Sequence, residues 1–327
     1  MSDIHQLLPF NPLIGGSNPH VQTLFARFHH PKIAFTPVWQ QLNTPDGDEL
    51  DIAWSEDPNQ LSKDDCRPLF ILFHGLEGSI DSPYAHGLMQ AFQQAGWLSV
   101  IMHFRGCSGR PNKTARAYHS GETSDPRHFI SWLHAHHPQR KKMAVGVSLG
   151  GNMLANYLID YANQPLIDAA TIVSAPFDLA ACSERVNQGL SKVYQSYLLH
   201  SLKRNAQQKQ PIYRAAIAIE KNQIRSISTL KQFDDQLTAP LHGFVDAKDY
   251  YARCSAISRL EKIRVPTLII HAQDDPFMTQ AVIPKQSLPS HIDYSLLKHG
   301  GHVGFVAGSI RKPIYWLEHA LPLYYQS

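Results

Sequence analysis

Short apolar runs alternate with longer amphipathic stretches along most of the chain, and this alternation restricts the fold more than any other feature. The apolar runs are too short for helices and are bounded by Gly, Pro or polar residues, so they predict buried strands, and the stretches between them have helical spacing. The predicted strands lie within residues 68–75, 97–106, 142–148, 168–176, 265–275 and 292–302. The predicted helices lie within residues 82–96, 123–138, 149–162 and 313–321. Strands that alternate with helices predict an α/β fold, with a mostly parallel central sheet and helices on both faces.

The alternation stops between residues 178 and 261 and then resumes. This stretch contains two polar-rich segments with helical spacing, 191–209 and 214–227. We therefore expect a helical cap inserted into an α/β core made of residues 1–177 and 262–327. Residues 1–35 are rich in Pro, Gly and Asn and predict an irregular N-terminal arm. Residues 37–56 follow, with two alternating runs around "PDGD" that predict a β-hairpin.

Composition excludes several classes of protein. The 327 residues are 43% hydrophobic and 17% charged, which is typical of a well-cored globular protein rather than a disordered one. A net charge of +3 without a long basic run makes nucleic acid an unexpected partner. The histidines lack zinc-ligand spacing, so we expect neither a metal nor another cofactor. We see no signal peptide, no transmembrane segment and no CxxC pair, and we expect a cytoplasmic protein with reduced thiols.

Ser148 lies between two glycines in Gly146-Val147-Ser148-Leu149-Gly150, which matches the pattern G-x-S-x-G. The pattern alone is weak evidence, because a serine in a tight turn also fits it. Here it stands between a predicted strand and a predicted helix, where a strained turn lifts the serine hydroxyl above the sheet. The helix N-terminus behind it supplies partial positive charge. We therefore predict that Ser148 is a nucleophile.

A nucleophilic serine needs a base and an acid, which in this arrangement follow it in the order acid, then histidine. Asp274 and Asp275 come directly after a late buried strand, and His299 and His302 follow the last strand. We choose His302, because two glycines before it allow its loop to reach over the sheet. We choose Asp275 as the acid, and expect its neighbour to cap the loop.

Two backbone N–H groups are needed to bind the negative charge that develops on the attacked carbonyl. We expect one from Leu149, the residue after the nucleophile. The other is expected from Leu76, in the loop His74-Gly75-Leu76-Glu77-Gly78 that follows a predicted strand. We expect His74 to order this loop by hydrogen bonding.

The chain resembles the α/β-hydrolase superfamily and, within it, the AB hydrolase 4 family in its bacterial YheT-like form. The resemblance covers nearly the whole chain and rests on "NPHVQTLFARF", "HGLEGS", "HFRGCSG", "GVSLGGN", "VSAPFDL", "FDDQLTAPLHGFVDAKDYY", "AQDDPF" and "HGGHVGF". It implies the α/β-hydrolase fold, with Ser148 as nucleophile, Asp275 as acid and His302 as base. It also implies carboxylester hydrolysis, since family members are described as carboxylester hydrolases. Some eukaryotic relatives are described as medium-chain acyltransferases or as acting on phospholipids.

These observations favour a serine hydrolase that cleaves carboxylic esters of small molecules through an acyl-enzyme. An acyltransferase using the same acyl-enzyme is the alternative, because both reactions share the three residues. A non-catalytic binding protein on the same fold is a third hypothesis, and it predicts that one of the three is missing. All three positions are filled.

The cap should determine which substrates fit. Four residues in its first long segment share one helical face and are expected to roof an apolar pocket of limited depth: Val193, Tyr194, Tyr197 and Leu198. Such a pocket favours short- to medium-chain acyl esters. Tyr250 and Tyr251 are expected to pack the cap onto the sheet, and Arg105 and Cys107 to shape a loop at the same end.

Overall fold

The computed structural model describes residues 7–62 and 64–326. Its centre is an eight-stranded sheet in the order β1-β2-β4-β3-β5-β6-β7-β8. These strands are β1 (Val38–Asn43), β2 (Glu49–Trp54), β3 (Leu69–Phe73), β4 (Leu98–Met102), β5 (Lys142–Val147), β6 (Ala169–Val173), β7 (Thr267–Ala272) and β8 (Ile292–Leu297). Six neighbouring strands of this order, β4, β3, β5, β6, β7 and β8, pair in parallel. Strands β1 and β2 form the predicted antiparallel hairpin at one edge. The predicted mostly parallel sheet is therefore confirmed.

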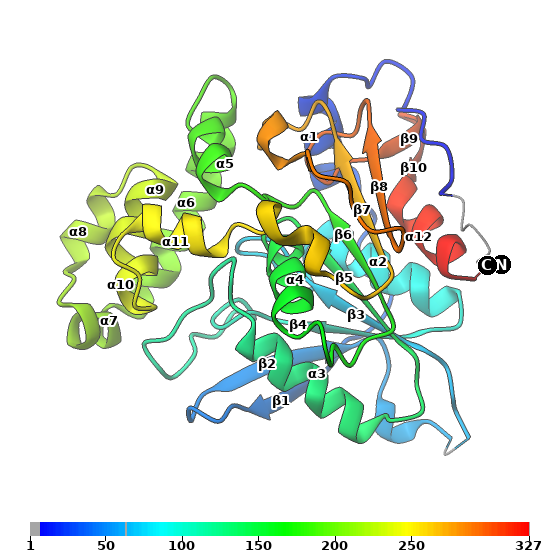
Figure 1. The fold of residues 1–327 in the computed structure, drawn as a ribbon, viewed down its shortest axis with the longest axis horizontal. Helices are drawn as coiled ribbons and strands as arrows, with labels where there is room; N and C mark the ends of the chain where they lie inside the picture. Colours follow the sequence, from blue (N-terminus) through cyan, green and yellow to red (C-terminus); the bar gives the residue numbers. More distant parts are fainter. Residues whose placement is uncertain (1–6, 63, 327) are drawn as a thin grey trace.

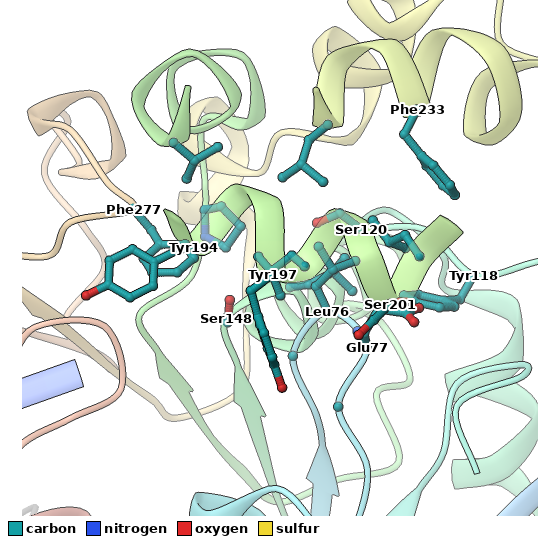
Figure 2. Close-up of a pocket in the computed structure, with 18 of the residues that line it drawn as sticks. Leu76, Glu77, Tyr118, Ser120, Ser148, Tyr194, Tyr197, Ser201, Phe233 and Phe277 are labelled. Atoms are coloured by element: carbon teal, nitrogen blue, oxygen red, sulfur yellow. Dashed lines mark hydrogen bonds between the residues drawn. The ribbon is translucent and has the colours of Figure 1, made fainter. Parts of the chain in front are cut away.

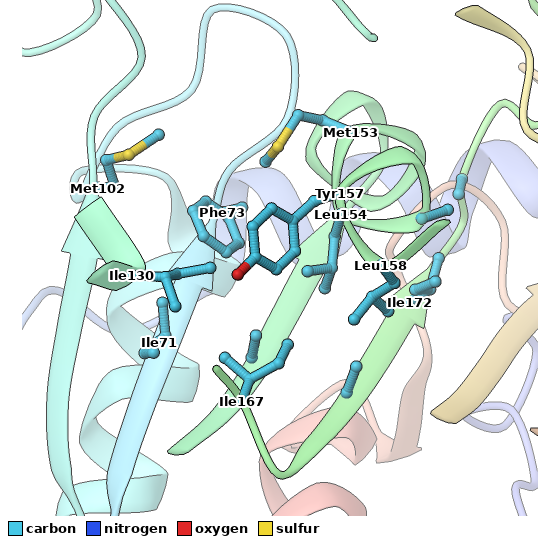
Figure 3. Packing of buried hydrophobic residues seen from close by; sticks show 14 of the residues in the cluster. Ile71, Phe73, Met102, Ile130, Met153, Leu154, Tyr157, Leu158, Ile167 and Ile172 are labelled. Carbon is cyan, nitrogen blue, oxygen red and sulfur yellow. The ribbon is translucent and has the colours of Figure 1, made fainter. Parts of the chain in front are cut away.

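Helices cover both faces of this sheet (Figure 1). Side chains of β3 alternate between the faces, because successive residues of a strand point in opposite directions. Ile71 and Phe73 pack in one hydrophobic cluster with α3 (Ser124–His136) and α4 (Leu149–Asp160), which Figure 3 shows from close by. Phe70 and Leu72 pack in a second cluster with α2 (Pro83–Gln94) and α12 (Trp316–Gln326). The sheet is buried from both sides, which explains its continuous apolar strands.

Between β6 and β7 the described chain forms helices and no strand. These are α5 (Leu179–Val186), α6 (Ser191–Gln208), α7 (Gln210–Ile217), α8 (Lys221–Ser226), α9 (Leu230–Phe233), a π-helical turn η2 (Asp234–Thr238), α10 (Ala239–Leu241), α11 (Ala247–Cys254) and the 3₁₀ helix η3 (Ile257–Lys262). In Figure 1 most of them extend to one side of the sheet. Short 3₁₀ helices η1 (Pro58–Gln60) and η4 (Gln280–Val282) lie elsewhere in the core.

The prediction of one helical segment over residues 214–227 was wrong. The structure has two short helices there, α7 and α8, because the chain turns at Ala218. Ala218 has a left-handed backbone (φ +54°) and ends α7, and the side chain of Glu220 caps α8. The last predicted helix begins later than expected. Residues 312–315 form strand β10 (Lys312–Tyr315), which pairs with β9 (Val306–Ser309) in a small hairpin that the sequence did not suggest.

The prediction of a wholly irregular N-terminal arm was also wrong. Residues 19–29 form helix α1 (Pro19–His29), while residues 1–6 lie outside the described part. The Asn18 side chain caps this helix by accepting the backbone N–H groups of His20 and Val21, and Pro19 occupies its first position. An Asn-Pro pair is a helix-start signal, because proline fits the first turn and asparagine satisfies its free N–H groups. The surrounding Pro and Gly residues hid this signal in the sequence.

Helix α4 packs unusually close to the sheet, and glycines permit this. A Cβ atom added to Gly150 would come within 2.4 Å of the carbonyl oxygens of Phe73 and His74. At the neighbouring Gly151 the same addition meets Ala175 Cβ at 3.0 Å and the Gly146 carbonyl oxygen at 3.1 Å, which is tight but requires a much smaller shift. The backbone of β3 and its following loop therefore sets how near α4 can lie, and only glycine fits at position 150.

We predict that Gly150→Ala lowers the free energy of unfolding by about 1–3 kcal/mol relative to Gly151→Ala, the range for overpacking a well-packed core. Both substitutions gain the same helix propensity, so the difference isolates the steric clash. Chemical denaturation of the two variants measures it. Equal stabilities for the pair would contradict this account of the close packing.

Candidate active site

Ser148 lies at the turn between β5 and α4, directly before the first helical residue. Its backbone is left-handed (φ +54°, ψ −121°), a conformation that costs a non-glycine residue free energy and is concentrated at functional sites. Hydrogen bonds hold the turn in place: the Ser148 N–H donates to Val173 O (2.8 Å), and Ser148 O accepts from Gly151 N (2.9 Å). The predicted strand–serine–helix context is present, and it aims the serine hydroxyl into a cavity.

The structure brings Ser148, His302 and Asp275 together. The distance from Ser148 Oγ to His302 Nε2 is 3.0 Å, and His302 Nδ1 lies 2.9 Å from Asp275 Oδ2. A carboxylate only accepts hydrogen bonds, so Nδ1 carries the proton and Nε2 is free to accept the serine hydroxyl. The histidine is therefore oriented to remove a proton from Ser148.

The two adjacent aspartates have separate partners. Asp275 is fully buried, and its other oxygen, Oδ1, accepts the backbone N–H of Phe277 (2.8 Å). Asp274 instead accepts His299 Nδ1 (3.2 Å) and the backbone N–H of Gly301 (3.0 Å). The alternative pair that the sequence left open, Asp274 and His299, thus shapes the loop that carries His302. It does not reach Ser148.

An aromatic ring covers the histidine. Phe277 stacks on the His302 imidazole with ring centroids 4.0 Å apart and an angle of 21° between the planes. Tyr194 of α6 lies against Phe277 at 5.0 Å, as Figure 2 shows to one side of Ser148. The stack limits how far the imidazole can rotate and restricts water on that side. The sequence analysis did not single out Phe277.

Helix α1 holds the histidine loop from a part of the chain remote in sequence. The backbone N–H of His302 donates to Thr23 Oγ1 (2.9 Å), and that hydroxyl donates to Pro19 O (2.8 Å). Gln22, which is fully buried, bonds Gly16 O and both backbone groups of Val306. The sequence analysis missed these residues because it assigned the segment to an irregular arm. The Asn-Pro helix start was the signal that could have found the helix.

The loop after β3 lies beside Ser148. A Cβ atom on Gly75 would come within 3.2 Å of Ser148 Cβ, so the loop backbone passes directly over the serine. Leu76 and Leu149 both line the same cavity as Ser148. Within the described residues, neither Leu76 N–H nor Leu149 N–H has a hydrogen-bond acceptor. Two free donors near the hydroxyl are what stabilisation of an oxyanion requires.

His74 orders this loop as expected. It is fully buried, and burial together with neighbouring His103 lowers its pKa to about 3, so the ring is neutral. Its Nε2 accepts the backbone N–H of Phe104 (3.0 Å), and its Nδ1 donates to Gly75 O (2.7 Å). One neutral ring therefore ties the loop to the end of the neighbouring strand β4.

Glu77, the residue after Leu76, adds a clamp that the sequence did not indicate. Its backbone is left-handed (φ +54°), and its N–H donates to the Tyr118 hydroxyl (3.0 Å), which itself donates to Glu77 Oε1 (2.7 Å). Asn205 of α6 donates to the other carboxylate oxygen. Burial raises the pKa of Glu77, against the opposing effect of these hydrogen bonds and of Arg204. The clamp joins the loop after β3 to helix α6.

A cavity of about 700 Å³ lies between this end of the sheet and the helices between β6 and β7. Its lining includes Ser148, Leu76 and His302 below, and all four residues predicted to roof it: Val193, Tyr194, Tyr197 and Leu198. In Figure 2, Phe233 points into it from above. Its size lies within the range that holds small organic ligands. Most of the side chains around it are apolar.

Four residues that the sequence analysis singled out have contacts that account for their positions: Arg105, Cys107, Tyr250 and Tyr251. Arg105 is buried and forms ion pairs with Asp46, Asp48 and Asp125, so it organises its loop. Cys107 is buried and burial raises its pKa, which disfavours a reactive thiolate. Tyr250 and Tyr251 are buried and also line the cavity. The Tyr250 hydroxyl accepts the backbone N–H of Ser120, and the Tyr251 hydroxyl donates to Asp234 and lies 3.1 Å from Ser183 Oγ.

Residues 7–62 and 64–326 contain no group of three or more His, Cys, Asp or Glu side chains placed to hold a metal ion. In the same part of the chain, no helix has both the length and the apolar character needed to cross a bilayer.

We predict that Thr23→Val lowers kcat/KM by roughly 2- to 12-fold, because a hydrogen bond worth about 0.5–1.5 kcal/mol to the His302 loop is lost while side-chain volume is kept. Thr23→Ser keeps the hydroxyl and should retain most of the activity. Steady-state kinetics with a soluble ester measure both variants. A Thr23→Val enzyme as active as the wild type would show that α1 does not position the histidine.

Comparison with known proteins assigns the family. The sequence profile of the α/β hydrolase fold matches residues 68–309. The chain is 52% identical over 314 residues to YheT of Escherichia coli, and the match covers 96% of this chain and 92% of YheT. YheT carries a provisional name as an esterase. It is 32% identical over 264 residues to a monoacylglycerol lipase of Saccharomyces cerevisiae, across 77% of this chain and 58% of the yeast protein.

A solved structure shows the same fold. The esterase Pf2001 of Pyrococcus furiosus superposes with a TM-score of 0.51 at 14% identity, over 83% of this chain and 84% of that one. At this identity the likeness concerns the fold alone. The family match and the identity to YheT carry the assignment, and they agree with the resemblance seen in the sequence. The chain therefore belongs to the α/β-hydrolase fold family, in the branch that contains YheT.

Proposed function

We propose that this protein is a serine hydrolase that cleaves carboxylic esters through an acyl-enzyme, with Ser148, His302 and Asp275 as its catalytic triad. The observation that carries the proposal is the hydrogen-bonded chain Ser148 Oγ–His302–Asp275 at the floor of an apolar cavity. The names of its relatives, esterase and monoacylglycerol lipase, belong to the same class of reaction.

In the proposed first half-reaction, His302 Nε2 takes the proton of the Ser148 hydroxyl while Oγ forms a bond to the ester carbonyl carbon. The carbonyl oxygen becomes negative and is bound by the N–H groups of Leu76 and Leu149. When this intermediate collapses, the C–O bond to the alcohol breaks and His302 gives its proton to the leaving alkoxide. The acyl group is then bonded to Ser148.

In the second half-reaction, water takes the place of the alcohol. His302 accepts a proton from water, the hydroxide attacks the acyl carbon, and Ser148 leaves with the proton returned by His302. Asp275 keeps the histidine in the required tautomer and stabilises its positive charge in both halves, which is the role of the acid in such triads. Phe277 stacks on the imidazole and limits its rotation away from Asp275.

We further propose that residues 178–261 form a cap that selects the acyl chain. The support is that α6 places Val193, Tyr194 and Leu198 in the lining of the cavity that contains Ser148. An apolar cavity of this size favours short to medium acyl chains, because each methylene gains up to about 0.8 kcal/mol until the space is filled.

We also propose a cytoplasmic location. The four cysteines are free thiols, which supports it.

We predict that Ser148→Ala reduces esterase activity on the order of 10³-fold or more, because the residue that forms the acyl bond is gone. A fluorophosphonate probe should label the wild-type protein and not the variant. Undiminished labelling of the Ser148→Ala protein would contradict the assignment of the nucleophile.

A matched pair of variants distinguishes the roles of Asp274 and Asp275. Asp275→Asn should lower kcat on the order of 10²- to 10⁴-fold, because it disturbs the tautomer of His302. Asp274→Asn affects only the loop and should cost much less. Turnover of a p-nitrophenyl ester measures both, and the reverse order would assign the acid to Asp274.

The acyl preference is tested with p-nitrophenyl acetate, butyrate, hexanoate, octanoate and palmitate. We expect kcat/KM to rise with chain length and then to fall once the cavity is full. A maximum at acetate would show that the cavity does not bind the acyl chain. Adding an alcohol to the same assay and measuring the new ester determines what share of the acyl-enzyme undergoes acyl transfer rather than hydrolysis.

A further inference from the structure

Two stripes of exposed apolar side chains border the opening of the cavity. Helix α1 contributes Val21, Leu24 and Phe28, and the start of α6 contributes Leu190, Val193 and Tyr197. Each stripe has the spacing i, i+3, i+7, so its members share one side of their helix. We call these six residues the mouth rim. Their exposed fractions range from 42% to 73%, and all of them except Val21 also line the cavity.

The two stripes lie next to each other because α1 and α6 are bonded side chain to side chain. Arg27 donates to the Tyr197 hydroxyl (2.6 Å), and His20 Nδ1 lies 2.9 Å from the Tyr194 hydroxyl. The mouth rim is therefore one continuous feature at the entrance of the site. Large exposed apolar patches of this kind are uncommon on proteins that bind nothing there.

The two chain segments that carry the mouth rim have charged residues of one sign. Residues 7–45 and 185–219, which include α1 and α6, contain eight Lys and Arg residues and no Asp or Glu, although the chain has 27 acidic residues. Arg27, Lys32 and Lys192 are exposed. The acids that line the cavity, Glu77, Asp81 and Asp234, come from other segments. An apolar patch on acid-free, basic helices is complementary to a surface that is both apolar and negative.

We propose that the mouth rim docks on the surface of an anionic phospholipid bilayer. The apolar side chains enter the boundary between headgroups and acyl chains, and the nearby cations face the lipid phosphates, as for amphipathic helices that lie in a membrane interface. A second copy of the chain fits less well, because two acid-free basic surfaces repel each other. Docking places the cavity opening against the bilayer, so that a lipid-soluble ester enters without crossing water; this last step rests on the proposed function.

The test is flotation of purified full-length Ser148→Ala protein with vesicles, since this variant binds without consuming lipid esters. We expect it to float with vesicles that contain about one third phosphatidylglycerol, to float much less with pure phosphatidylcholine, and to be released as salt increases. Absence of flotation with either vesicle would overturn the proposal. Because no turnover is measured, the result stands apart from that of the esterase assays.

Two sets of surface variants locate the binding site. Phe28→Ser combined with Val193→Ser should reduce vesicle binding by at least about tenfold, since two large exposed apolar groups no longer enter the lipid. Val245→Ser combined with Ile310→Ser changes two apolar residues that are 89% and 69% exposed and lie outside the cavity lining, and this pair should leave binding unchanged. If the two pairs reduced vesicle binding equally, the assignment of the mouth rim as the lipid-binding surface would be wrong.

Two further measurements separate a loss of lipid binding from a loss of folding or of catalysis. Thermal unfolding of both double variants establishes that they are folded. Val21→Ser, which changes the one mouth-rim residue that does not line the cavity, made with Ser148 intact, should keep its activity on a water-soluble short ester and lose part of its activity on the same acyl ester presented in anionic vesicles. If the wild type instead dimerises with increasing concentration, and the Phe28/Val193 pair abolishes that dimer without affecting lipid binding, the rim is a contact between copies and the proposal is wrong.

Discussion

The close contact between the start of α4 and the ends of β3 and β5 is the constraint on which the site depends. Gly150 lets the helix backbone approach the carbonyl oxygens of Phe73 and His74, and Gly146 lies so near Gly150 that a Cβ there would fall 2.5 Å from its oxygen. With this packing, Ser148 takes a left-handed backbone and its side chain projects above the sheet. The same contact places the loop after β3, with the Leu76 N–H group, over the serine. Ser148 and the N–H group of Leu76 are thus positioned by one packing contact.

The histidine is positioned differently, from three sides. Asp275 binds its ring from the end of β7, Phe277 covers its face, and Thr23 binds its backbone from α1. A loop with two glycines is otherwise free to take many conformations, and fixing it costs conformational entropy. The hydrogen bonds from separate segments offset that cost. The N-terminal segment is therefore part of the site, although it is far from it in sequence.

The helices between β6 and β7 contact both the cavity and the loop after β3. Asn205 of α6 binds Glu77, which lies next to Leu76, so a movement of α6 would shift the Leu76 N–H group. Tyr194 of the same helix touches Phe277, which covers His302. One helix thus contacts both halves of the proposed machinery as well as α1. In the proposed function, this arrangement links the binding of an acyl chain under α6 to the geometry of Ser148, His302 and Leu76.

The sequence by itself determined the alternating strands and helices, the parallel sheet and the strand–serine–helix turn, and it singled out His302 and Asp275, which the structure places beside Ser148. These depend on local signals: apolar runs, glycine spacing and positions directly after strands. It did not reveal α1 over the site, the Glu77–Tyr118–Asn205 clamp, the stacking of Phe277 or the two-helix break at Ala218. Apart from the local turn at Ala218, those features depend on contacts between residues far apart in the chain, such as Gln22 and Val306, which are 284 positions apart. Only the tertiary structure decides which distant side chains meet, because periodicity and capping report on neighbours within a few turns of the chain and not on packing between segments.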